Sequence, residues 1–181
     1  MAEAAEITPS EDSLLTEKLS IGKVEYDVNL TSSVLRFTKT VGKGKPPVHR
    51  IIQLEEILNI HLSEKPEDPS LTLCFIDKAK KQWKCNKTVF KGKDSETCER
   101  IREKVLAAVA VKTPDRPKSL LVIINPKSGG SKGQKIYDRQ VFPILELTGI
   151  KVTLLVTERA GHAREYVQEF DLASVDGILV V

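Results

Sequence analysis

The chain has 181 residues and a net charge of +3, with 40% hydrophobic and 29% charged residues. This balance excludes a wholly disordered chain and a small disulfide scaffold, and the length suits one domain or two. The three cysteines are an odd number without a CxxC spacing, so we expect reduced thiols rather than disulfides or a zinc site.

The beginning of the chain is acidic, whereas the remainder is basic. Residues 1–20 carry five acids and one base, so the other 161 residues together carry a charge of +7. The first residues lack the apolar run of a signal peptide, and no stretch approaches the roughly 20 apolar residues of a membrane-spanning helix. We therefore expect residues 1–19 to be a disordered acidic tail on a cytoplasmic protein.

Residues 20–112 are predicted to form one domain of antiparallel strands that ends in a helix. Short alternating segments indicate strands, and residues 49–62 fit either a strand or a helix. The period changes after Asp94, where apolar residues recur every three or four positions and the aspartate can cap a helix. This order of elements is typical of a pleckstrin-homology-like β-barrel capped by a helix.

The predicted hairpin of residues 71–76 and 82–90 is strongly basic. We expect Trp83 and Cys85 to face the core, so that the lysines face solvent and can bind an anionic membrane surface. The candidate membrane-binding residues are Lys78, Lys80, Lys81, Lys84 and Lys87. A lysine-rich strand also blocks unwanted strand pairing, which is the alternative interpretation. No nucleic acid partner is expected, because aromatic residues that would stack on bases are not interleaved with the lysines.

Residues 113–118 contain two prolines and predict a linker, after which the pattern changes again. Continuous apolar runs at 119–124, 151–156 and 177–181 are typical of buried parallel strands, with helical segments between them. Strand, helix, strand, helix, strand is the first part of a doubly wound α/β domain. The predicted fold class is therefore α+β followed by α/β.

A glycine-rich loop, residues 125–133, joins the first of these strands to a helix. Glycines let a backbone approach a phosphate closely, and amides at the start of the helix point toward it. The spacing fits neither a Walker A motif nor a dinucleotide fingerprint. Taken alone, the loop fits an ordinary turn between strand and helix better than it fits a phosphate site.

Two blocks, residues 121–130 and 157–165, together resemble the diacylglycerol-kinase-type catalytic domain, and within it the sphingosine and ceramide kinases. Asp176-Gly177-Ile178 before the third strand also matches, and the resemblance covers about residues 118–181. It implies an ATP-dependent lipid kinase of sphingolipid metabolism that uses Mg²⁺ and associates peripherally with membranes. The resemblance favours a sphingoid base as the lipid substrate, with ceramide as the alternative. A non-catalytic module that binds membranes or phosphoinositides is a further alternative.

The resemblance also implies which residues contact ATP. They are Asn125, Pro126, Lys127, Ser128, Gly129 and Gly130 from the first loop, and Thr157, Glu158, Arg159, Ala160 and Gly161 from the second. We expect His162 to begin a helix rather than act as a base, and we expect no metal-ligating side chain. In this family a Gly-Asp-Gly motif with the catalytic aspartate follows the third strand. The sequence ends at Val181, so we regard residues 119–181 as a truncated catalytic domain that is inactive alone.

Overall fold

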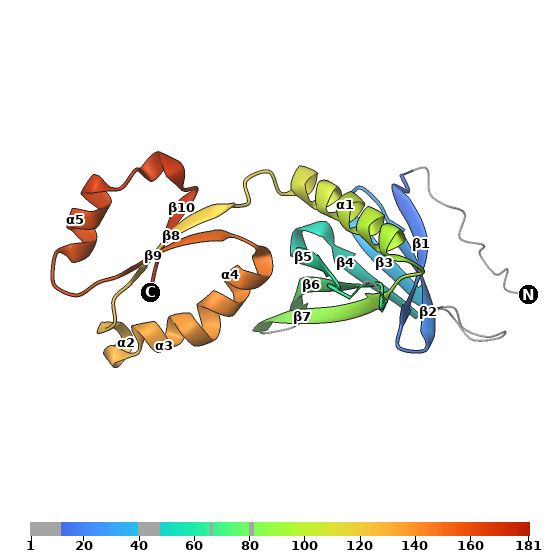
Figure 1. Cartoon of the computed structure of the whole chain (residues 1–181), viewed down its shortest axis with the longest axis horizontal. Coiled ribbons are helices and arrows are strands. Elements are labelled where there is room, and N and C mark those ends of the chain that lie inside the picture. The colour runs from blue at the N-terminus through green and yellow to red at the C-terminus, as the bar shows by residue number, and fades with distance from the viewer. Residues whose placement is uncertain (1–11, 40–47, 66, 80–81) are drawn as a thin grey trace, which may run out of the picture. The chain divides into compact units, whose positions relative to one another are not determined.

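The computed structural model of the chain describes residues 12–39, 48–65, 67–79 and 82–181, without the side chains of Ala79, Gln82 and Trp83 (Figure 1). The chain divides into two compact units, Met1–Pro114 and Asp115–Val181. Within the described residues, no helix is both long and apolar enough to cross a membrane.

The first unit is a seven-stranded antiparallel sheet followed by a helix, with the strands in the spatial order β4-β3-β2-β1-β7-β6-β5. Its elements are β1 (Leu15–Ile21), β2 (Val24–Leu30), β3 (Val34–Lys39), β4 (Val48–Gln53), η1 (Leu54–Glu56), β5 (Ile57–Leu62), β6 (Ser70–Ala79), β7 (Gln82–Lys91) and α1 (Ser95–Lys112). The ambiguous segment 49–62 therefore forms two strands joined by a short 3₁₀ turn.

The sheet curls around a core, but it does not close into the expected barrel. Among the described residues, β4 and β5 remain edge strands with no ladder between them. Phe37 of β3 nevertheless stacks on Phe90 of β7 with ring centroids 4.8 Å apart, although β2 and β1 lie between these strands in the sheet. The helix α1 covers the edge at β5, where Arg102 Nε donates a hydrogen bond to the Ile60 carbonyl at 3.2 Å. A helix therefore covers the edge that barrel closure would have paired.

The predicted amphipathic helix α1 is confirmed. Its buried residues recur at intervals of three and four; they are Cys98, Ile101, Val105 and Val109. Asp94 caps the helix by accepting a hydrogen bond from the Thr97 amide at 2.7 Å, and this bond holds the pKa of Asp94 below its usual value. A Cβ at Gly92 would lie only 2.3 Å from Cys98 Sγ, so a larger residue where the chain enters the helix would force the cysteine side chain to shift.

The expected tail is wrong at its carboxyl end, because β1 begins at Leu15. Leu19 is only 2% exposed and belongs to the core. Between these leucines, Glu17 forms an ion pair with Arg100 of α1. Glu17 occupies a position where an alternating strand pattern would have an apolar residue, so the pattern did not predict this strand. Its partner Arg100 is 83 residues away and could not be inferred locally. Residues 1–11 of the expected tail lie outside the described residues.

The β6–β7 hairpin forms as predicted, but Cys85 does not face the core. Leu71, Leu73 and Phe75 share the buried face of β6, as expected. The register places Asn86 opposite Phe75 and Cys85 opposite Ile76, so Cys85 lies on the other face and is exposed. The expectation for Trp83 concerns a side chain outside the described residues.

The second unit is a three-stranded parallel sheet in the order β10-β8-β9 with helical segments between the strands, as predicted. Its elements are β8 (Ser119–Ile124), α2 (Ser128–Ser131), α3 (Gly133–Ile136), η2 (Tyr137–Val141), α4 (Phe142–Thr148), β9 (Lys151–Val156), α5 (His162–Glu169), η3 (Leu172–Ser174) and β10 (Gly177–Val180).

The central strand β8 is buried on both faces, which explains its continuous apolar sequence. Val122 and Ile124 pack with Tyr137 and Leu145 on one side. Alternate residues of the same strand pack on the other side with α5. At the amino end of the strand, Asp176 Oδ2 accepts hydrogen bonds from the backbone amides of residues 118 and 119 at 2.7 and 2.8 Å. This aspartate therefore positions the start of the sheet.

Candidate nucleotide site

The three parallel strands end side by side, and the two sequence blocks meet there. The backbone N–H of Asn125 donates a hydrogen bond to the Val181 carbonyl at 2.9 Å, and the backbone N–H of Thr157 donates one to the Ile124 carbonyl at 2.8 Å. The loops after β8 and β9 therefore start from neighbouring positions at the carboxyl edge of the sheet. In doubly wound sheets this is the edge beyond which ligands bind.

The first loop turns immediately after β8 because Asn125 accepts hydrogen bonds from the backbone of the residues that follow it. Asn125 Oδ1 accepts a hydrogen bond from the Lys127 amide at 3.0 Å, and its carbonyl accepts one from the Ser128 amide at 3.0 Å. Asparagine forms such local turns readily. The side-chain oxygen of Asn125, a predicted ATP contact, therefore helps to shape the loop.

The middle of the first loop is left-handed over three consecutive residues. Gly129, Gly130 and Ser131 have φ values of 55°, 71° and 65°. Glycine adopts this conformation without a steric cost, which explains the pair of glycines. Nothing lies within 4 Å of the position that a Cβ would occupy at Gly130. The loop backbone is therefore open to a ligand at this point.

Gly133 is a positioning residue that was not among the predicted site residues. A Cβ at this position would lie 2.2 Å from the Asn125 carbonyl oxygen and 2.6 Å from Ser128 Oγ. The start of α3 therefore packs against the first loop at a distance that only glycine permits. The signal in the sequence was the last glycine of the loop, placed directly before the predicted helix.

The second loop is tied to the first and carries its own ion pair. Thr157 Oγ1 donates to the Ile124 carbonyl at 3.2 Å, in addition to the backbone bond of the same residue. Arg159, which the resemblance placed among the ATP contacts, pairs with Glu165, with Nη1 and Oε1 2.8 Å apart. This hydrogen bond lowers the pKa of Glu165 and raises that of Arg159. The guanidinium is thus held across the loop.

His162 begins α5, as expected, and it also holds the second loop. Its Nδ1 accepts a hydrogen bond from the Glu158 amide at 3.2 Å. The structure therefore gives this histidine a local positioning contact.

The candidate membrane-binding lysines belong to the first unit and do not share one face. Lys78 forms an ion pair with Glu56 at 3.4 Å. Lys84 and Lys87 are exposed, but the register places Lys84 opposite Asp77 and Lys87 opposite Cys74, on alternate faces of β7. The predictions for Lys80 and Lys81 lie outside the described residues.

Nowhere in the described ranges do three or more His, Cys, Asp or Glu side chains gather closely enough to hold a metal ion. In the two loops, Glu158 is the carboxylate without an ion pair among the described residues. These side chains do not fit a magnesium site built by the protein alone.

Comparison with known proteins identifies the domain and then the family. Residues 119–181 match the diacylglycerol kinase catalytic domain. Human ceramide kinase is 33% identical over 167 residues, which cover 82% of this chain and 31% of that protein. Human ceramide kinase-like protein is 29% identical over 184 residues, covering 91% and 32%. Sphingoid long-chain bases kinase 1 of Arabidopsis thaliana is 43% identical over 63 residues, covering 34% and 8%.

The chain therefore contains a diacylglycerol kinase catalytic domain sequence at residues 119–181. It belongs to the ceramide and sphingosine kinase family, which confirms the resemblance seen in the sequence. The chain spans about a third of the length of the human relatives that it matches.

Proposed function

We propose that the loops after β8 and β9 bind ATP in an ATP-dependent lipid kinase. The observation that carries this proposal is the hydrogen bond from Thr157 to the Ile124 carbonyl, which brings both loops to one edge of the sheet. Phosphoryl transfer depends mainly on positioning and on electrostatic stabilisation of the phosphates. An open glycine backbone with nearby cations is suited to holding the phosphates in position.

The first loop would hold the phosphates, and the second would form the other wall of the site. Gly129 and Gly130 leave the backbone accessible, while Lys127 and Lys132 are exposed and have no ion pair among the described residues. The lysines therefore supply positive charge opposite the phosphates. We assign Arg159 to holding its loop, because Glu165 already binds its guanidinium.

Kinases receive ATP with Mg²⁺, which neutralises charge on the phosphates. The described side chains of this site do not form a metal-ligand cluster, so the phosphates of ATP would be the principal ligands of the ion.

For the lipid, the sequence block at residues 157–165 favoured a sphingoid base, whereas the relatives favour ceramide. The match to human ceramide kinase covers 82% of the chain and therefore extends into the first unit. The match to the plant sphingoid-base kinase covers 34%, which is about the length of the second unit. We therefore propose ceramide as the phosphoryl acceptor and a sphingoid base as the second candidate.

ATP binding is tested on the purified 181-residue chain by isothermal titration calorimetry. Replacing Lys127 and Lys132 with glutamine removes two charge-assisted contacts, and we expect ATP affinity to fall by about tenfold or more. The matched control replaces Lys84 and Lys87 with glutamine, which removes the same charge from the first unit. Equal affinity of both variants and the unmodified chain would contradict the assignment of the first loop.

The lipid is tested on the protein purified from cells that express it. Ceramide and sphingosine are offered separately with labelled ATP, and we expect label in the ceramide product. Preferential labelling of sphingosine would contradict the choice of ceramide and would support a sphingoid base as the substrate, as the sequence resemblance favours. Absence of label from both lipids would contradict the lipid-kinase proposal.

We also propose that the first unit is a pleckstrin-homology-like module that contacts anionic membranes through the β6–β7 hairpin. The supporting observation is that Lys84 and Lys87 are both exposed. Because they lie on alternate faces of β7, such a contact requires the hairpin to approach the membrane with its strand ends rather than with one face.

A further inference from the structure

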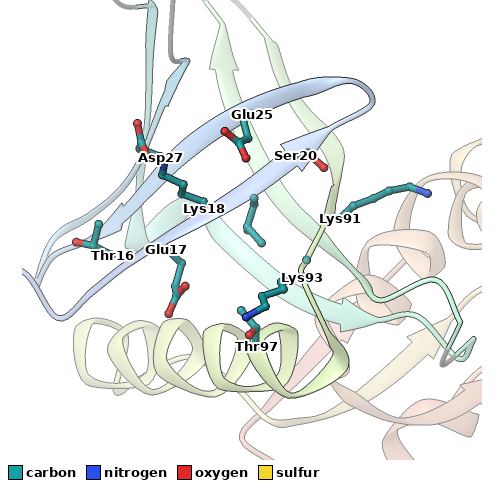
Figure 2. Close-up of a pocket in the computed structure, with 11 residues that line it drawn as sticks. Thr16, Glu17, Lys18, Ser20, Glu25, Asp27, Lys91, Lys93 and Thr97 are labelled. Atoms are coloured by element: carbon teal, nitrogen blue, oxygen red, sulfur yellow. The ribbon is translucent and has the colours of Figure 1, made fainter.

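A groove of about 650 Å³ lies between β1 and the start of α1 in the first unit (Figure 2). Residues of β1 and β2 form one side, and Gly92, Lys93 and Thr97 form the other. Its volume lies within the range of pockets that bind ligands. The groove belongs to the first unit, whereas both nucleotide loops belong to the second.

The strand beside this groove has a free edge. β1 pairs with β2 along all seven residues, but it pairs with β7 only at Ser20, opposite Lys91. Within the described residues, no strand runs along the other edge of residues 15–19. Backbone amides and carbonyls of a strand point alternately to its two sides, so this edge presents unpaired groups. The edge at β5 differs, because α1 covers it and donates a hydrogen bond there through Arg102.

Charges of both signs surround the free edge. Lys91 is held by Asp68 at 2.7 Å, and Glu17 is held by an arginine of α1. Lys93 and Glu25 form no ion pair among the described residues. Figure 2 shows Lys93 on the side of α1 and Glu25 on the side of the β1–β2 hairpin. Lys18 and Asp27 also line the side of β1 and β2, so this wall carries charges of both signs, whereas Lys93 places a cation on the side of α1.

We propose that the groove binds an extended peptide segment of a partner protein, which adds as a strand to the free edge of β1. The peptide main chain would pair with the unpaired groups of residues 15–19, as in other strand-addition complexes. One acidic side chain would face Lys93, and one basic side chain would face Glu25. Five residues of strand extend about 17 Å at 3.4 Å per residue, so the bound segment is about five or six residues long.

Hydrogen exchange of the 181-residue chain tests the main-chain pairing. The probe is a synthetic peptide of alternating threonine and valine with one lysine and one glutamate near its opposite ends. We expect the edge-facing amides of residues 15–19 to exchange at least tenfold more slowly in its presence. A peptide of the same sequence with alternate N-methylated amides should give no protection, because it cannot donate the hydrogen bonds.

Several outcomes of this experiment would overturn the proposal. Equal protection by both peptides would show that strand pairing is not involved. Protection confined to β4, the other open edge, would place the peptide at a different site. Protection of residues 15–19 that is already present without peptide, and is lost on deletion of residues 1–11, would show that the chain occupies the groove itself.

A charge exchange tests the polarity of the groove. The double variant Glu25→Lys and Lys93→Glu should bind the probe about two- to fivefold more weakly for each reversed charge. A peptide in which lysine and glutamate have exchanged places should recover the original affinity. The control variant Lys104→Glu changes an exposed lysine of α1 that does not line the groove and should leave both affinities unchanged. Equal binding of both peptides by the double variant would contradict the proposed contacts.

Discussion

Gly133 offers the sharpest test of how the candidate nucleotide site is built. In the variant Gly133→Ala, the new Cβ would lie 2.2 Å from the Asn125 carbonyl oxygen, whereas Cβ contacts under 3.0 Å are essentially never observed. The loop and the helix start must therefore separate by about 0.8 Å. Overpacking of this kind costs about 1–3 kcal/mol, while alanine recovers up to about 1 kcal/mol through its better helix propensity. With the full recovery subtracted, we expect a net loss of up to about 2 kcal/mol.

The assay measures hydrogen exchange of the β8 amides for stability and calorimetric ATP affinity for the site. The matched variant is Gly130→Ala, where a Cβ meets open space but φ is 71°. That variant should lose about 1–2 kcal/mol from its left-handed backbone without moving α3 against the loop. ATP affinity should therefore fall more in Gly133→Ala than in Gly130→Ala. Unchanged stability and affinity in Gly133→Ala would refute this account of the packing.

Three further predictions concern other parts of the chain. Hydrogen bonds from backbone amides lower the pKa of Asp176 in the folded protein. Its contribution to stability is therefore present above the unfolded-state pKa of about 3.9 and is lost as the pH falls through the folded-state pKa. Asp176→Ala should therefore lower the urea midpoint at pH 6 and flatten its decline below pH 4; an unchanged acid profile would contradict this. Gly92→Ala should cost about 1–3 kcal/mol because its Cβ meets Cys98 Sγ at 2.3 Å, and Cys98→Ala in the same chain should relieve most of that cost in a denaturation double-mutant cycle. Replacing Lys84 and Lys87 with glutamine should weaken sedimentation with phosphatidylserine vesicles roughly thirtyfold, at about 1 kcal/mol per lysine, whereas removal of the two lysines of the first nucleotide loop should not.

The parts of this protein that local patterns predicted are those in which burial repeats over a few residues. The stripe on α1 recurs every three or four positions because one side of the helix is buried in the core. The apolar run of β8 is continuous because both faces of that strand are covered. The structure adds that Gly129 and Gly130 of the first loop have a left-handed backbone, which glycine adopts without a steric cost.

The sequence by itself therefore determined the order of elements, the parallel sheet and the family, because these depend on short motifs and on periodicity. Only the tertiary structure decided which partners the polar side chains find. Glu17 faces inward because Arg100 lies over it, and Cys85 faces outward because the register of β6 against β7 sets its side. The sheet stays open because α1 covers one edge, and Gly133 is required because Asn125 lies against it. Each of these outcomes depends on contacts between residues that are apart in the chain, and local periodicity carries no record of such contacts.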